Sequence, residues 1–181
     1  MTSETQGDDP AAPVKRRMAE AYLPRADDWF EAQEPGVTYL TPSRTVTDAD
    51  VMIFGGLTGD LCELHTNEAY ARTTPFGGRI AHGMLNLSLA HGLVVRAGHL
   101  VGTGVALLGW NNVKFSAPVR IGDTVQARWT TIEKRALRSK PEVGVVTDLI
   151  ELLNEDGVVV MSGEVSSLVR KRPKEASVRK P

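Results

Sequence analysis

Asp60 and His65 are the residues of this chain whose types and spacing best suit acid–base chemistry. An imidazole ionises nearer to neutral pH than any other side chain, and a nearby carboxylate can orient and tune it. Both residues stand in residues 58–65 (TGDLCELH), which we interpret as a loop. Asp and His also occur close together by chance. The alternative is therefore an ordinary surface loop, in which Asp60 only caps neighbouring backbone groups.

A second segment, residues 80–83 (IAHG), leads directly into a long apolar stretch. Residues 82–97 are apolar nearly all round, which is typical of a buried helix. The free N–H groups and the dipole at the start of a helix favour developing negative charge, and Gly83 lets a ligand approach its own N–H closely. Gly83 is therefore a candidate donor to a substrate oxygen that gains negative charge during a reaction. We expect His82 to brace the entry to the helix; alternatively, the glycine only shapes a turn.

The rest of the pattern predicts an α+β fold. One early strand is expected at residues 37–46, followed by a helix capped by Thr47 with Asp50 three residues on. Four segments rich in Val, Thr, Ile and Trp follow the apolar helix and are separated by turn residues, at 104–115, 124–137, 143–153 and 158–169. An antiparallel sheet has one face to cover, so we expect a curved sheet wrapped around a long central helix.

Composition narrows the classes of function. The chain has 181 residues, 41% hydrophobic and 24% charged, with a formal net charge of −1. These values fit one globular domain at residues 37–170, with an irregular or disordered tail at 1–36 and a basic tail at 171–181. They give no reason to expect nucleic acid or a membrane as partner. The single cysteine and the lack of a secretory signal favour the cytoplasm, and no metal-ligand or nucleotide-binding spacing is present.

Three motifs resemble the MaoC-like, or (R)-specific enoyl-CoA hydratase, family of hot-dog-fold proteins. The family's loop runs Ser/Thr-Gly-Asp-x-Asn-Pro-x-His, and Thr58, Gly59, Asp60 and His65 match it in type and spacing. Residues 75–84 (PFGGRIAHGM) and 113–125 (VKFSAPVRIGDTV) are similar to the family's helix entry and its strand–turn–strand segment. The resemblance implies a hot-dog fold, a homodimer or higher homo-oligomer with pockets where subunits meet, and an acyl-CoA or acyl-carrier-protein thioester as substrate. No cofactor beyond the substrate's own coenzyme A is implied.

The chain departs from the family at two places. Cys62 and Glu63 replace the Asn-Pro that stiffens the loop in most members. Many members also carry a serine on the buried helix near the catalytic Asp, and we match that position to His91. His91 is therefore a candidate substrate-binding residue; the alternative is a core histidine. Three cations, Arg79, Lys114 and Arg120, could meet the phosphates of coenzyme A or be ordinary surface charges.

Three functions remain open at this point. A hydratase or dehydratase would use Asp60 and His65 to add water to an enoyl thioester or to remove it. A hot-dog thioesterase would instead direct water to the carbonyl carbon and release a thiol. A non-catalytic acyl-thioester-binding subunit is the third hypothesis, prompted by the Cys62-Glu63 replacement.

Overall fold

A computed structural model describes residues 28–173 of the chain. Its centre is one antiparallel sheet of five strands in the order β1-β3-β4-β5-β2. The strands are β1 (Thr38–Thr45), β2 (Gly104–Phe115), β3 (Thr124–Ala136), β4 (Val143–Leu153) and β5 (Val159–Arg170). Each lies within one residue of its predicted bounds, because apolar alternation and turn residues mark both ends of every strand.

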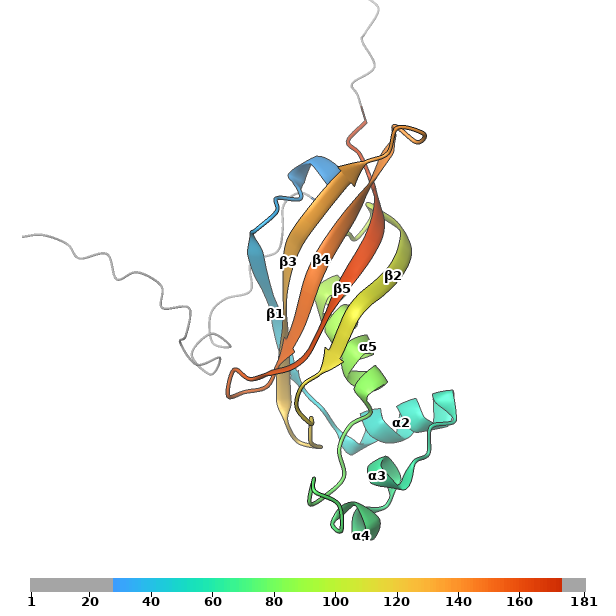
Figure 1. Cartoon of the computed structure of the whole chain (residues 1–181), viewed down its shortest axis with the longest axis vertical. Helices are drawn as coiled ribbons and strands as arrows, with labels where there is room; N and C mark the ends of the chain where they lie inside the picture. The colour runs from blue at the N-terminus through green and yellow to red at the C-terminus, as the bar shows by residue number, and fades with distance from the viewer. Residues whose placement is uncertain (1–27, 174–181) are drawn as a thin grey trace, which may run out of the picture.

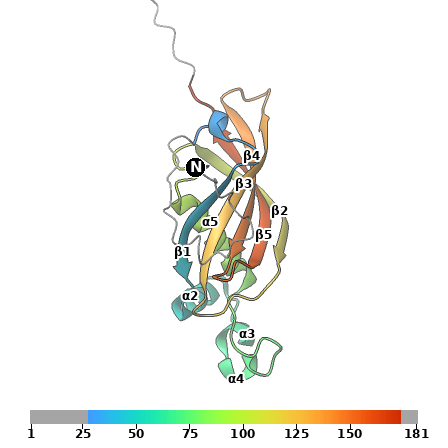
Figure 2. The ribbon, with the colours of Figure 1, turned by 90° about the vertical axis from the view of Figure 1, so that its left-hand side faces the viewer.

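The long helix α5 (Gly83–Arg96) covers one face of this sheet, and the strands curve around it (Figures 1 and 2). Its buried side chains include Leu85, Leu93 and Val94, which join one core with inward-facing residues of the strands. At the edge of the sheet formed by β1 and β3, Tyr39 stacks on its cross-strand partner Trp129 with ring centroids 5.1 Å apart. The predicted fold class, a curved antiparallel sheet around a central helix, is therefore confirmed.

Three short helices, α2 (Asp48–Thr58), α3 (Glu63–Thr66) and α4 (Glu68–Ala71), gather beyond one end of the sheet (Figure 1). The predicted capping box is present, since the Thr47 side chain accepts from Asp50 N–H and Asp50 accepts from Thr47 N–H. The interpretation of residues 58–65 as a loop was wrong at both ends, because Thr58 is the last residue of α2. Residues 63–65 belong to α3, where His65 N–H donates to the Cys62 carbonyl at 2.9 Å.

The described part of the predicted N-terminal tail, residues 28–36, contains one turn of 3-10 helix at Phe30–Ala32. Phe30 is buried against β4, where Gly144 has no Cβ to clash with the ring. Residues 1–27 of the predicted N-terminal tail and residues 174–181 of the basic tail lie outside the described residues. Between residues 28 and 173, no helix is both long and apolar enough to cross a bilayer.

Candidate active site

Asp60 is placed by a sharp chain reversal at the end of α2. Gly59 closes the helix in the left-handed conformation (φ 80°), and its N–H donates to the Gly55 carbonyl at 2.8 Å. Only glycine adopts this conformation without strain. Gly55 also lets the loop pack closely, because a Cβ there would lie 3.0 Å from the carbonyl oxygen of Asp60. The reversal leaves the Asp60 side chain exposed.

His65 presents one defined ring nitrogen. Its Nδ1 lies 2.8 Å from the carbonyl oxygen of Ile80. A carbonyl oxygen only accepts, so in the neutral ring Nδ1 carries the proton and Nε2 keeps a lone pair. Ile80 is itself fixed by a bridge to Arg120, and the next N–H, of Ala81, donates to the Val119 carbonyl at 2.8 Å. The backbone around residue 80 therefore orients His65 as a proton acceptor.

His82 connects these two residues. Its Nε2 lies 2.9 Å from the Asp60 carbonyl, and its ring lies against His65 with centroids 3.9 Å apart and planes tilted by 34°. The side chain is only 1% exposed. The sequence-based expectation that His82 braces the entry to α5 agrees with these contacts, which reach both Asp60 and His65.

Asp60, His65 and His82 form one cluster, in which one nitrogen or carboxylate oxygen from each lies within 4.8 Å of the others. Such a donor set could in principle hold a transition metal ion. One nitrogen of each imidazole donates to a backbone carbonyl, which leaves His65 Nε2 and His82 Nδ1 as the nitrogens that keep a lone pair, and the two ring planes are tilted by 34°. The absence of a metal cofactor stays a prediction.

A pocket of about 270 Å³ opens beside the cluster. His65 and Gly83 both line it, and Gly83 is the first residue of α5, where N–H groups have no partner within the helix. The other lining residues are mostly apolar, as an acyl chain would require: Phe76, Ile80, Ala81, Phe115, Ala117 and Pro118, with Ser116 and Asn86. Sequence reasoning missed Asn86, although a lone amide in an otherwise apolar helix could have signalled it.

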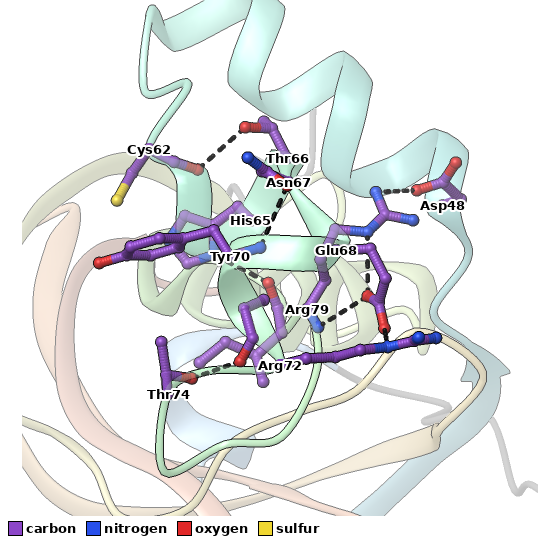
Figure 3. Close-up of polar contacts among 12 residues, drawn as sticks. Asp48, Cys62, His65, Thr66, Asn67, Glu68, Tyr70, Arg72, Thr74 and Arg79 are labelled. Carbon is purple, nitrogen blue, oxygen red and sulfur yellow. Dashed lines mark hydrogen bonds and ion pairs between the residues drawn. The ribbon is translucent and has the colours of Figure 1, made fainter.

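The Cys62-Glu63 replacement is accommodated by the one-turn helix α3. Thr66 Oγ1 donates to the Cys62 carbonyl at 3.2 Å, and Asn67 Nδ2 donates to Glu63 Oε1 at 2.9 Å. Asn67 then caps α4 by accepting from Tyr70 N–H (Figure 3). Local hydrogen bonds thus order the segment that carries His65, without the ring of a proline.

Replacing Glu63 by Pro is expected to raise the free energy of unfolding by about 0.4–1 kcal/mol. Glu63 is the first residue of α3, a position that proline favours, and Cys62 has the extended geometry (φ −53°, ψ 137°) that precedes proline. Urea unfolding would measure the change. Glu63→Ala is the matched control, since it also loses the exposed bond to Asn67 but gains no ring. A proline variant less stable than the alanine variant would contradict this account of the loop.

Of the three cations considered for coenzyme A phosphates, Arg79 is already paired. Its guanidinium lies 2.8 Å from Asp48 and 3.6 Å from Glu68 (Figure 3). Hydrogen bonds from the Arg79 N–H and from Arg72 lower the pKa of Glu68, which keeps this carboxylate charged. Arg120 donates to the Phe76 carbonyl, whereas Lys114 is an exposed residue of β2. Arg79 and Arg120 therefore fix the loop between α4 and α5.

The structure places His91 away from the cluster. It lines a different pocket, of about 280 Å³, together with His99 and Asp148. Burial, and secondarily the neighbouring His99, lower the pKa of His91, and its ring meets the edge of Trp110 at 6.0 Å. The geometry thus brings together Asp60, His65, His82 and Gly83 but not His91, and it does not support the serine match made for His91.

Comparison with known proteins agrees with the motifs and the fold. The model of the MaoC like domain matches residues 31–152. The (R)-specific enoyl-CoA hydratase of Rhodospirillum rubrum is 35% identical over 155 residues, which cover 81% of this chain and 98% of that protein. Protein MaoC of Klebsiella aerogenes is 42% identical over 106 residues, but these span only 31% of its length and 59% of this chain.

A solved structure shows the same fold at greater distance. It is a Mycobacterium tuberculosis protein with a double hot-dog fold, which superposes with a TM-score of 0.70 at 19% identity over 84% of this chain and 46% of that one. With the hot-dog arrangement, the Thr-Gly-Asp…His loop and the matching domain model in hand, the chain belongs to the MaoC-like dehydratase family.

Proposed function

We propose that this protein is an (R)-specific enoyl-thioester hydratase, or in reverse a 3-hydroxyacyl-thioester dehydratase. The observation that carries the proposal is the convergence of Asp60 and His65, beside a largely apolar pocket that begins at Gly83. The family assignment and the enoyl-CoA hydratase and dehydratase names of several relatives support it.

The mechanism needs only groups of this chain and a water molecule. His65 Nε2 and the Asp60 carboxylate each accept a hydrogen bond from the water, and one of them takes its proton as the oxygen attacks the β-carbon. The pair returns one proton to the α-carbon, so that one molecule of water has been added across the double bond. Gly83 N–H stabilises the thioester oxygen while it carries enolate charge.

The proposed partners follow from the same chemistry. The substrate carries its acyl chain on coenzyme A or on an acyl carrier protein, and we propose that the reaction takes place in the cytoplasm. A homodimer is favoured by the edge strand β2, which exposes Val105, Leu107, Leu108 and Phe115. A long apolar edge strand invites pairing with another chain. Light scattering of the purified protein would measure the assembly.

A thioesterase remains the second candidate, since the same pair could direct water to the carbonyl carbon. A binding subunit without turnover is the third. The presence of both Asp60 and His65 in one cluster favours catalysis over binding alone, and the match to the hydratase loop favours hydration over hydrolysis.

Two parallel assays on crotonyl-CoA and on longer and methyl-branched trans-2-enoyl-CoAs test the proposal. Loss of the enoyl-thioester absorbance without release of free thiol is the expected result. Thiol release would instead identify a thioesterase. Tight binding of the acyl-CoAs with neither signal would identify a binding subunit.

A further inference from the structure

Asn86 is a buried amide that faces the candidate active-site pocket. It is the only amide side chain in α5, is 3% exposed, and lines the pocket together with His65 and Gly83. Its Oδ1 is buried and accepts no hydrogen bond from any of residues 28–173. Buried polar atoms in native proteins are nearly always paired, so an orphan oxygen at a pocket wall calls for a ligand group.

The position of Asn86 on the helix indicates which part of a ligand it meets. Residues three apart lie on the same helix face, so Asn86 follows Gly83 about 4.5 Å further along the axis. With the thioester oxygen at Gly83 N–H and the β-carbon at His65, this distance reaches the acyl carbons just beyond the double bond. Asn86 is thus suited to contact the γ-carbon or its substituent.

We propose that Asn86 determines specificity, and that the preferred substrate is a short enoyl thioester with a hydroxyl group on its γ-carbon. This rests on the proposed hydratase function. A plain alkyl chain would leave the buried Asn86 oxygen without a partner, and an unsatisfied polar atom typically costs a factor of about 5 to 150 in an equilibrium constant. A hydroxyl both donates and accepts, so it satisfies the carboxamide in either orientation of its oxygen and nitrogen.

The test uses two substrates that differ only in this group, trans-4-hydroxybut-2-enoyl-CoA and trans-pent-2-enoyl-CoA, in which a hydroxyl replaces a methyl. The purified wild-type protein is expected to show at least a fivefold higher kcat/KM for the hydroxylated substrate. Asn86→Leu removes the amide at similar volume and is expected to lose or reverse this preference while still hydrating pent-2-enoyl-CoA. The matched control is Thr147→Val, a polar-to-apolar change at a cross-strand pair on β4, outside the pocket, which should leave the preference unchanged.

A binding measurement separates this inference from the proposed function. Calorimetry with the saturated analogues 4-hydroxybutanoyl-CoA and pentanoyl-CoA needs no turnover, and the wild type is expected to bind the first more tightly. Asn86→Ala provides a second variant if the leucine variant does not fold. Equal affinity of the wild type for the two ligands would overturn the role of Asn86. A preference for the hydroxylated ligand that survives both substitutions would do the same. Absence of hydration with the binding preference intact would overturn the hydratase proposal alone.

Discussion

Replacing Asp60 by Asn is expected to lower kcat/KM for hydration by about 100- to 10,000-fold, the usual contribution of a positioned acid or base. The asparagine keeps the size of the side chain and leaves the backbone carbonyl that accepts from His82. The carboxylate itself is exposed, and it accepts one long hydrogen bond, of 3.4 Å, from Cys62 N–H. The loss should therefore fall on the reaction and not on the fold.

Three measurements make the result interpretable. The thermal midpoint of Asp60→Asn should stay close to that of the wild type, which shows that the fold survives. His65→Ala should cause a comparable loss, because the two residues act on the same water. Glu63→Gln is the matched control: it neutralises an exposed carboxylate of the same segment, keeps the acceptor for Asn67, and should retain activity. Full activity in Asp60→Asn on a confirmed substrate would remove Asp60 from the mechanism.

The fold was predictable because its signals are local. Alternating apolar residues bounded by turn residues mark each strand, and a run of apolar residues on all sides marks α5. The end of the catalytic loop was not predictable in this way. Residues 63–66 (ELHT) form α3 through bonds to the Cys62 carbonyl and to Asn67, and four residues are too few for a periodic pattern.

The candidate site was predictable only in part. Motif spacing singled out Asp60, His65 and Gly83, which belong to two segments of the chain. The ring contact between His82 and His65, and the opening of a pocket at Asn86, depend on how the two segments pack. His91 shows the converse error. It lies nine residues after His82, further along α5, and lines the pocket that also contains His99 and Asp148.

Removing the carboxylate of Asp148 is expected to destabilise the protein more than any other change considered. Asp148 is 1% exposed, accepts from Thr131 Oγ1 at 2.7 Å, and lies 2.9 Å from Nε2 of His99, which is 4% exposed. Asp28 lies 3.6 Å from the other ring nitrogen of His99. Breaking a buried ion pair by deleting one partner typically costs about 3–5 kcal/mol, and Asp148→Ala should fall in that range.

The loss of unfolding free energy caused by removing the Asp148 carboxylate should depend on pH in a defined direction. Burial alone would lower the pKa of His99, but hydrogen bonds to Asp148 and Asp28 outweigh it and raise the pKa above its ordinary value of 6.5. A group whose pKa is raised by folding contributes stability that is fully present below the unfolded pKa and is lost as pH rises through the folded pKa. Nearby His91 adds no opposing charge at neutral pH, since its own pKa is lowered.

Urea unfolding of the wild type and of Asp148→Asn from about pH 5 to about pH 9 tests this sign. Asparagine can still accept from Thr131 but removes the charge that favours protonated His99. The difference in unfolding free energy between the two proteins should be largest below pH 6.5 and shrink as pH rises above it. Glu133→Ala, an exposed carboxylate on β3, is the control and should change stability by less than about 0.5 kcal/mol throughout. A difference that grows with pH would mean that His99 is neutral in the folded protein and that its partner carboxylates do not outweigh its burial.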